Sequence, residues 1–471
     1  MQNIIFAGQK VLVLGMGLSG RSAAEFLLAQ GASVYGIDRD AQLLATHPEI
    51  QTLKQAGLNV YPEREFQNVE LFDLLIISPG VPSNHPLVHM AQQSQIPMMG
   101  EIELGCQVAQ NPIFGITGTN GKTTVTMLVT HVLNQCNQSA KALGNVGVPL
   151  TRELLQTDPQ SLLVLELSSY QIETLYHRCL EAALILNITP DHLDRYENME
   201  AYAKAKCEIV RPLKWGRPLY IEERAWSQYG HLLEKGKLRL YGYQETNFIY
   251  TDLAAVFREG KKAFELPFSL QDKKSHDLEN LLAAYAFCAD RGISGTDFLN
   301  AWQSFKKPAH RMEFITEHQG VRYYDDSKGT NIDAVIRAVQ SLEGPLILIA
   351  GGVDKGAAYT PWLEEFKNKV KLICAIGQAA GKIHDHLASQ IPVMILSSLK
   401  EAVHQAIRCA EKGDNVLLSP GCASFDMFKD YAHRGKEFQR IVWEIIHPHL
   451  SSGIEAGHDL SHERDRRSKG K

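Results

Sequence analysis

The feature that most constrains the fold is a glycine-rich loop between a short apolar strand and a helix. Residues 115–124 read GITGTNGKTT. Such glycines let backbone N–H groups face an anion, and the helix that follows adds the positive end of its dipole. Lys122 can then reach terminal phosphates, and the Thr123 hydroxyl can hold a magnesium ion. The loop therefore predicts a protein that binds, and splits, ATP or GTP.

The glycine spacing and a nearby acid narrow this prediction. Five residues separate Gly115 from Gly121, whereas the common phosphate-loop pattern has four, so the loop belongs to a distinct group of phosphate-binding enzymes. A second apolar strand, Leu162–Leu165, runs into Glu166. Because Mg²⁺ prefers oxygen ligands and takes few of them from protein, we expect Glu166 to complete a magnesium site beside the loop.

Composition limits the class of protein. A chain of 471 residues is too long for one core, and about three domains are expected. The net charge of -5 argues against a nucleic-acid partner. Eight cysteines without a C-x-x-C pair indicate reduced thiols in the cytoplasm. The sequence shows neither a signal peptide nor a long apolar run, so no membrane insertion is expected.

Strand and helix patterns divide the chain into three α/β segments and a tail. Residues 1–105 predict a Rossmann-like domain, 106–307 a central phosphate-loop ATPase domain, and 308–450 a second Rossmann-like domain. In the last segment, strands such as Leu346–Ile349 alternate with helical stretches. Residues 451–471 are polar and charged, and a disordered tail is predicted there.

The first segment carries a second glycine-rich turn. The strand Lys10–Leu14 ends in GMGLSG at residues 15–20, and a helix follows. With Asp38 at the end of the next strand, this is the fingerprint of a dinucleotide site, in which a diphosphate lies at the helix N-terminus. An NAD-dependent dehydrogenase would fit this motif, but the chain shows no site for hydride transfer. The fingerprint alone leaves the nucleotide open.

A polar cluster, NITPDHLDR, fills residues 187–195 after an apolar strand predicted at Ala183–Ile188. His192 in this cluster could bind a metal ion or orient a phosphate. The next predicted helix, about Met199 to Val210, carries Lys204 and Lys206. A lysine ammonium repels Mg²⁺, so either residue could bind metal only after carbamylation by CO₂.

Three polar loops follow predicted strands in the last segment, at residues 325–331, 351–356 and 419–424. They carry Lys355 and Ser424 at the carboxyl ends of their strands, which is where α/β sheets bind ligands. A lysine and hydroxyl groups in this position suit a small carboxylate substrate. Asn331 is a candidate N-cap for the helix that follows the first loop.

Taken together, these motifs resemble the Mur ligases, which are ATP-dependent amide-bond-forming enzymes of bacterial cell-wall synthesis. The resemblance rests on the loop GITGTNGKT, the cluster NITPDHLDR, ELSSYQ at 166–171, DSK at 326–328 and SPGCAS at 419–424, and it spans about residues 8–447. Within the family, the pattern is similar to that of the enzymes that add D-glutamate. Several positions depart from the usual pattern. Asp277 stands in place of Asn, Tyr431 stands in place of Phe, and Asp38-Arg39-Asp40 does not keep the family's DTR sequence.

The resemblance implies a role for each matching residue. The UDP-sugar would contact Gly17, Leu18, Ser19, Asp38, Arg39, Ser78, Gly80 and Asn145. ATP would contact Gly118, Thr119, Asn120, Gly121, Lys122, Thr123, Thr124, Asn280, Arg311 and Asp326. One Mg²⁺ would be held by Thr123 and Glu166, and a second by His192 and a carbamylated Lys206. D-Glutamate would lie among Lys328, Thr330, Lys355, Ser424 and Tyr431.

The implied catalytic groups are Lys122, His192 and Lys206, and the implied cofactors are ATP and two Mg²⁺ ions, with Mn²⁺ as an alternative. The implied substrates are UDP-N-acetylmuramoyl-L-alanine and D-glutamate, and a monomer is expected. Another amino-acid-adding Mur ligase and a folylpolyglutamate synthetase stay open as alternatives. From a different class, a phosphate-loop switch ATPase would need the central segment but not the loops that carry Lys355 and Ser424.

Overall fold

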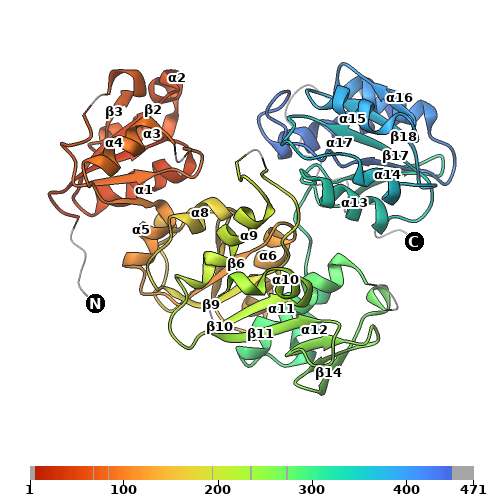
Figure 1. Ribbon diagram of the computed structural model, residues 1–471, viewed down its shortest axis with the longest axis horizontal. Coiled ribbons are helices and arrows are strands. Elements are labelled where there is room, and N and C mark those ends of the chain that lie inside the picture. Colours follow the sequence, from red (N-terminus) through yellow and green to blue (C-terminus); the bar gives the residue numbers. More distant parts are fainter. Residues whose placement is uncertain are drawn as a thin grey trace. The chain divides into compact units, whose positions relative to one another are not determined.

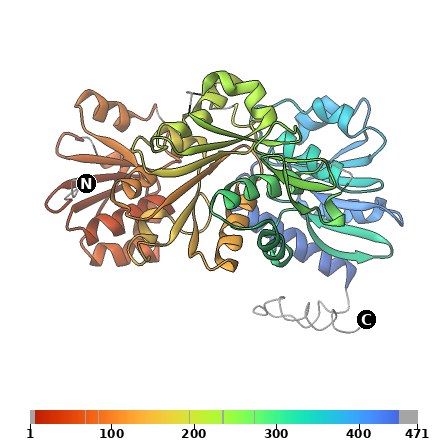
Figure 2. The same ribbon diagram turned by 90° about the horizontal axis from the view of Figure 1, so that it is seen from below.

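The computed structural model describes residues 6–66, 68–82, 84–193, 195–233, 236–271 and 274–447. Three β-sheets, each packed with helices, make up this part of the chain (Figures 1 and 2). This is the predicted α/β class, with a Rossmann-like sheet, a central phosphate-loop sheet and a second Rossmann-like sheet. The tail predicted at residues 451–471 lies outside the described residues.

The first sheet is fully parallel, in the strand order β3-β2-β1-β4-β5. Two apolar clusters cover its two faces. In chain order its elements are β1 (Lys10–Leu14), α1 (Leu18–Ala29), β2 (Ser33–Asp38), α2 (Ala41–Thr46), α3 (Pro48–Gln55), β3 (Asn59–Pro62), a 3₁₀ turn (Glu63–Glu65), β4 (Leu74–Ile77), α4 (Pro86–Gln93), β5 (Met98–Gly100) and α5 (Glu101–Val108).

The second sheet has nine strands, in the order β14-β13-β12-β11-β10-β9-β6-β8-β7. Strands β6 to β12 are parallel, and an antiparallel meander, β12 to β14, forms one edge. Its first elements are β6 (Ile113–Thr117), α6 (Lys122–Gln135), β7 (Ala140–Gly144), α7 (Leu150–Glu153), β8 (Leu162–Glu166), α8 (Ser169–Glu173), β9 (Leu180–Ile185) and α9 (Met199–Cys207). The remaining elements are β10 (Pro218–Glu222), α10 (Glu223–Tyr229), β11 (Lys237–Gly242), β12 (Ile249–Thr251), β13 (Ala255–Arg258), β14 (Lys261–Glu265), α11 (His276–Asp290) and α12 (Gly295–Ser304), with 3₁₀ turns at Glu208–Val210, Gly230–Leu232 and Phe268–Leu270.

The third sheet has six strands, in the order β15-β16-β20-β17-β18-β19, and only β15 is antiparallel to its neighbour. Its elements are β15 (Glu313–His318), β16 (Val321–Asp325), α13 (Ile332–Ser341), β17 (Leu346–Gly351), α14 (Pro361–Glu365), β18 (Val370–Ile376), α15 (Ala380–Leu387), β19 (Val393–Ile395), α16 (Leu399–Cys409), β20 (Asn415–Leu418) and α17 (Tyr431–Ile446). Asn331 caps α13 as predicted, because its side chain accepts a hydrogen bond from Ala334 N.

The chain forms two compact units. One holds the first and second sheets, up to Thr189 and again over Tyr196–Pro308. The other holds the third sheet, from Ala309 onward, together with the short segment Pro190–Arg195. The polar cluster at residues 187–195 is divided between the two units.

One strand differs from the sequence prediction. Strand β9 covers Leu180–Ile185, whereas Ala183–Ile188 was predicted. The apolar run continues past Ile185, but the backbone and side chain of Asn187 form hydrogen bonds with the phosphate loop instead of extending the strand. A polar side chain that pairs with a distant loop has thus shortened the strand.

Candidate functional site

The phosphate loop lies between β6 and α6, as predicted. Gly118 and Gly121 adopt φ angles of +150° and +85°, which favour glycine. A Cβ at Gly118 would come within 2.8 Å of Leu186, so the loop also has no room for a side chain there. Helix α6 begins at Lys122 without a side-chain cap. The first N–H groups of α6 and the positive end of its dipole can therefore serve an anion.

Two lysine ammonium groups converge on this loop. Lys122 Nζ donates to the carbonyl oxygens of Gly118 and Thr119, both at 2.8 Å. Lys206 Nζ, from α9, donates to the same Gly118 oxygen at 2.9 Å. Lys206 is only 2% exposed, whereas Lys204 is exposed on the same helix. Residues two positions apart on a helix face different directions, and Lys206 is the one that faces the loop.

A buried carboxylate ends the neighbouring strand β8. Glu166 is 2% exposed, and its Oε1 accepts a hydrogen bond from Asn145 Nδ2 at 3.0 Å. Within the described parts of the chain, no hydrogen-bond donor contacts the buried Oε2 of Glu166. An unpartnered buried carboxylate oxygen is costly, and it is the kind of ligand that Mg²⁺ prefers. The register pairs Glu166 with Ile116, so this oxygen lies at the loop end of β6.

Residues that follow β9 hold the backbone of the phosphate loop. Asn187 Oδ1 accepts from Asn120 N at 2.8 Å, and Asn187 Nδ2 donates to Asn120 O at 3.1 Å. Thr119 Oγ1 accepts from Thr189 N at 3.0 Å. The NIT portion of the polar cluster therefore supports the loop, a role that the sequence did not assign to it.

Helix α11 brings Asn280 against the loop. A Cβ at Gly121 would lie 2.4 Å from Asn280 Oδ1, so that amide packs directly on the glycine. Asp277, which stands where the family usually has Asn, instead accepts a hydrogen bond from Lys307 Nζ at 2.6 Å. Of these two α11 residues, the contacts favour Asn280 as the nucleotide-facing group.

A carboxylate holds the glycine-rich loop of the first sheet. Asp38 Oδ2 accepts from Met16 N at 2.7 Å, and its Oδ1 accepts from Asp40 N at 2.9 Å. Ser78 Oγ donates to Gly15 O at 2.7 Å. Because β2, β1 and β4 are neighbours, their loops meet at one edge of the sheet. The predicted UDP-sugar residues of this sheet lie on those loops or where they begin a helix, namely Gly17, Leu18, Ser19, Asp38, Arg39, Ser78 and Gly80.

The residues predicted around the amino-acid substrate lie in the third-sheet unit. Lys328 and Thr330 follow β16, Lys355 follows β17, Ser424 follows β20, and Tyr431 begins α17. The strands β16, β20 and β17 are adjacent. Backbone hydrogen bonds join their loops, from Gly421 N to Gly329 O at 2.8 Å and from Val353 N to Ala423 O at 2.9 Å. The fold thus gathers these five residues at one edge of the sheet.

Lys328 also contacts Tyr431 directly. Its Nζ lies 3.9 Å from the centroid of the tyrosine ring, within the range of a cation–π interaction. This contact needs only an aromatic face, so the tyrosine retains what the more usual phenylalanine would provide.

The segment 190–195 places an acid beside Lys355. Asp191 Oδ1 lies 3.1 Å from Lys355 Nζ, and Asp191 Oδ2 accepts from Asn331 Nδ2 at 3.2 Å. Burial would raise the pKa of Asp191, but the charges of Lys355 and His192 and these hydrogen bonds outweigh it and lower that pKa. His192 adopts a φ of +56°, and its Nε2 lies 3.6 Å from Asp191 Oδ2. A small cavity lined by Asp191, His192, Asn331 and Lys355 lies here.

Asp326, predicted to bind ATP, is buried at the end of β16. Its Oδ2 accepts from Ser419 Oγ at 2.7 Å, and its Oδ1 accepts from Met312 N at 3.3 Å. Burial raises the pKa of Asp326 to about 7, although the Ser419 hydrogen bond and the charge of Arg311 act in the opposite direction. The carboxyl group can therefore carry a proton near neutral pH.

His310 is a site neighbour that the sequence did not reveal. Its Nδ1 lies 2.6 Å from Asp325 Oδ2, its backbone N donates to Glu313 Oε2, and its carbonyl accepts from Lys328 N. Burial would lower the pKa of His310, but the hydrogen bond and charge of Asp325 raise it. His310, Glu313 and Asp325 are close enough to hold a metal ion. However, the Gln439 amide donates to both carboxylates, so we interpret the group as a hydrogen-bond network.

The residues predicted to hold the second metal ion are divided between the two units, and so are the residues predicted to bind ATP. Glu166 and Lys206 belong to one unit and His192 to the other, and Asn280 is likewise separated from Arg311 and Asp326. The complete second metal site and the complete ATP site therefore stay predictions.

A membrane-spanning helix is absent from the described residues, since none of their helices is both long and apolar enough.

Comparison with known families covers all three sheets. Residues 9–100 match the model of the MurD-like N-terminal domain of Mur ligases, residues 116–288 that of the Mur ligase middle domain, and residues 310–422 that of the Mur ligase glutamate ligase domain. The chain belongs to the Mur ligase family, whose members are ATP-dependent amide-bond-forming ligases.

Individual relatives narrow the comparison. The chain is 55% identical to the UDP-N-acetylmuramoylalanine–D-glutamate ligase of Protochlamydia amoebophila, over 93% of this chain and 98% of that protein. It is 34% identical to the enzyme of the same name from Caldanaerobacter subterraneus, with the same coverage.

Among solved structures, the fold is similar to that of UDP-N-acetylmuramate-alanine ligase MurC from Thermotoga maritima. The TM-score is 0.59 at 18% identity, over 93% of this chain and 100% of that one. It is also similar to MurF ligase from Thermotoga maritima, solved in complex with ADP. That TM-score is 0.58 at 14% identity, over 94% of this chain and 96% of that one.

Proposed function

We propose that this protein is an ATP-dependent ligase that joins D-glutamate to UDP-N-acetylmuramoyl-L-alanine in the synthesis of peptidoglycan precursors. The observation that carries this proposal is the 55% identity, over 93% of the chain, to a ligase of that name. The amino-acid-side loops agree with it, because they offer Lys328 and Lys355 to a dicarboxylate substrate.

We assign the ATP phosphates to the loop at residues 118–124. Lys122 supplies positive charge at Gly118 O, and it begins the helix whose N-terminus would carry the phosphates. Stabilising the charge of the transferring phosphoryl group is the main catalytic contribution expected for such a reaction.

We further propose that Thr123 and Glu166 hold one Mg²⁺ and that His192 and a carbamylated Lys206 hold a second, with Mn²⁺ able to substitute. The unpartnered Oε2 of Glu166 fits a hard cation. When bound, the ions offset the negative charge of the phosphates and of the attacking carboxylate.

The UDP part of the substrate is assigned to the glycine-rich loop of the first sheet, and Asn145 to the muramoyl-alanyl part. Asp38 orders that loop by accepting from Met16 N. The backbone N–H groups at the start of α1 can then bind the diphosphate.

The chemistry follows from these assignments. The terminal carboxylate of UDP-N-acetylmuramoyl-L-alanine attacks the γ-phosphate of ATP and gives an acyl phosphate with release of ADP. The amine of D-glutamate attacks the acyl carbon, loses a proton, and phosphate leaves. As an alternative to its metal-binding role, His192 is the residue that we propose as the proton acceptor. Asp191 beside it is ionised, because its pKa is lowered.

We retain the division of the chain into domains at residues 1–105, 106–307 and 308–450 as a proposal, together with a disordered tail and a monomeric state. The first boundary falls inside α5, and Glu103 of this helix accepts hydrogen bonds from Tyr176 N and His177 N beside the second sheet. These contacts favour a first boundary at Gly100, before α5, over the one at residue 105. The eight unpaired cysteines are consistent with a cytoplasmic location.

The deciding assay combines the protein with ATP, Mg²⁺ and UDP-N-acetylmuramoyl-L-alanine and measures phosphate release with single amino acids. We expect release with D-glutamate only. Release with a different amino acid alone would contradict the substrate assignment, and release without any amino acid would indicate a switch ATPase.

A further inference from the structure

A buried arginine on the first turn of α17 contacts the loops of the proposed amino-acid site. Arg434 is 1% exposed. Among the described residues, the guanidinium donates to oxygens of Ser327, Cys422 and Ala423 and forms no ion pair, although the charges of Asp426, Asp325 and Asp326 act on it. Burial lowers the pKa of Arg434 to about 10, so it still carries its charge at neutral pH. A buried charge that forms no direct ion pair is costly unless hydrogen bonds satisfy it. The hydrogen-bond partners of Arg434 therefore indicate its role.

Within the described residues, every hydrogen bond of the Arg434 guanidinium goes to one of two loops. Its Nε donates to Ser327 Oγ at 3.0 Å and its Nη2 to Ser327 O at 2.8 Å. Its Nη1 and Nη2 each lie 3.2 Å from Cys422 O, and Nη1 is 3.5 Å from Ala423 O. Ser327 is the residue before Lys328, and Ala423 is the residue before Ser424. One rigid, planar group thus fixes the backbone next to two of the residues assigned to D-glutamate.

The third loop of that site is also in contact. Val353 N donates to the Ala423 carbonyl that faces Arg434. A Cβ at Gly352 would lie 2.2 Å from Ala423 O and 3.3 Å from Arg434 Nη1, so the loop that leads to Lys355 packs closely against this pair. Ser327 Oγ in turn donates to Tyr431 O at 2.8 Å, which ties the first loop to the start of α17.

From these contacts we infer that Arg434 is a positioning residue that holds the loops carrying Lys328, Lys355 and Ser424 in register for the amino-acid substrate. The inference rests on the proposed function for the identity of that substrate. In this role, Arg434 does not touch the substrate but acts through the backbone that it binds.

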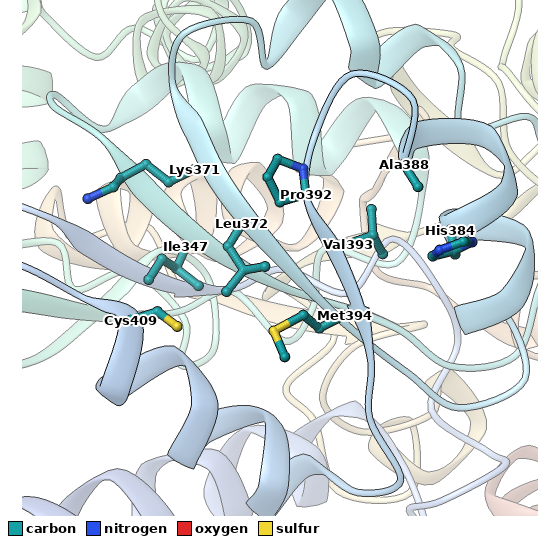
Figure 3. A pocket seen from close by; sticks show the side chains of 9 residues that line it. All are labelled: Ile347, Lys371, Leu372, His384, Ala388, Pro392, Val393, Met394 and Cys409. Atoms are coloured by element: carbon teal, nitrogen blue, oxygen red, sulfur yellow. The ribbon is translucent and has the colours of Figure 1, made fainter.

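A pocket elsewhere in this unit lies away from the loops that Arg434 contacts. This pocket, of about 570 Å³, is lined by Ile347, Leu372 and Val393 near the amino-terminal ends of β17, β18 and β19 (Figure 3). Lys371 at its rim is paired with Glu411 and Asp414. This pocket therefore lies at the opposite end of the sheet from the loops that carry Lys328, Lys355 and Ser424.

The test compares Arg434→Ala and Arg434→Lys with Arg440→Ala as the control. Arg440 lies on the same helix but is exposed and paired with Glu437 and Glu444. Displacing substrate-binding groups by about 1 Å can cost about 100-fold in activity. We expect the KM for D-glutamate to rise about 100-fold in Arg434→Ala and about 10-fold in Arg434→Lys, which keeps the charge but not the planar fork. The KM values for ATP and UDP-N-acetylmuramoyl-L-alanine should stay unchanged, as should all three in Arg440→Ala.

Circular dichroism and thermal melting would show whether each variant folds, and the assays would run well below the melting temperature. If Arg434→Ala does not fold, the inference would be tested with Arg434→Lys and Ser327→Ala. The second variant removes one hydrogen-bond acceptor of the guanidinium. An unchanged KM for D-glutamate in these folded variants, equal changes in all three KM values, or failure of every variant to fold would each overturn the inference. Absence of D-glutamate turnover by the wild type would instead refute the proposed function, and the variants would then be compared with the amino acid that the wild type accepts.

Discussion

The glycine-rich loops of the first and second sheets share a backbone plan but differ in charge. Each joins a buried parallel strand to a helix N-terminus. At the first loop, the carboxylate of Asp38 accepts from Met16 N. At the second, the ammonium groups of Lys122 and Lys206 both donate to Gly118 O, and the buried Glu166 lies at the end of the adjacent strand.

This difference separates binding from chemistry. A helix N-terminus and backbone N–H groups are enough to hold a diphosphate. Transfer of a phosphoryl group also needs charge that is already in place where negative charge develops. The second loop has both lysines and a candidate metal ligand, whereas the first has a carboxylate that orders the loop. We therefore expect substitutions at the second loop to reduce kcat and substitutions at the first to raise a KM.

The largest effect is expected for Lys206→Ala. Because this removes a buried charge at the phosphate loop, or a metal ligand if Lys206 is carbamylated, kcat should fall by about 10³-fold. The control is Lys204→Ala, on the exposed side of the same helix, which should keep full activity. Short-chain carboxylates should restore part of the Lys206→Ala activity if a carbamate is the active form. Full activity in the Lys206→Ala variant would contradict the proposal that charge at the second loop serves catalysis, whereas the first loop serves binding alone.

The next effect concerns Glu166→Gln. The amide can still accept from Asn145 but cannot bind Mg²⁺ with a full charge, so kcat should fall by about 100-fold and the Mg²⁺ concentration for half activity should rise. In metal-free buffer the variant should melt no lower than the wild type, because an unpartnered buried carboxylate oxygen has been removed.

Glu101→Gln is the matched control, since Glu101 is equally buried but its Oε1 accepts from Thr151 N and Oγ1. Its Mg²⁺ dependence should equal that of the wild type. An unchanged Mg²⁺ dependence in Glu166→Gln would show that Glu166 is a structural residue.

Asp38→Asn tests the first loop. The amide places an N–H₂ group against either Met16 N or Asp40 N, both of which are donors, so the loop should lose order. We expect the KM for UDP-N-acetylmuramoyl-L-alanine to rise about 10-fold, with kcat and the KM for ATP unchanged. Asp40→Asn is the control, because asparagine can still cap α2 as Asp40 does. A fall in kcat at saturating substrate would contradict the proposed division of roles between the loops.

Both glycine-rich loops and the fold class could be predicted from the sequence. The phosphate loop, the glycine-rich turn at residues 15–20 and the alternation of strands and helices are local patterns, and they predicted the fold class. The family that they suggested is confirmed by the comparisons with known proteins.

Contacts between distant residues could not be predicted in this way. Asp191 pairs with Lys355, 164 residues away in the chain, and no local pattern indicates such a pair. Arg434 looks like any charged residue on an amphipathic helix, because its burial depends on two loops that meet only in the folded sheet. The early end of β9 has the same cause, since Asn187 pairs with Asn120 across 67 residues.

The third sheet also has a buried carboxylate, Asp326, which can be compared with Glu166 of the second sheet. The effect expected from its substitution is the smallest. Asp326 resembles Glu166 in burial, but two donors, Ser419 Oγ and Met312 N, contact its oxygens. Burial nevertheless raises the pKa of Asp326 to about 7, above its value in an unfolded chain. The folded state therefore favours the protonated acid. Its contribution to stability is fully present below about pH 4 and is lost as the pH rises to about 7.

Asp326→Asn removes this titration. The free energy of unfolding of the variant, relative to the wild type, should rise between pH 4 and pH 8 by about 1 to 4 kcal/mol. The change with pH is the informative quantity, because the amide also alters the hydrogen bond from Ser419 by a pH-independent amount. Urea unfolding at several pH values, without nucleotide, measures it. A constant difference between the two proteins would mean that Asp326 is ionised throughout, and the buried carboxylates of the second and third sheets would then differ only in their hydrogen-bond donors.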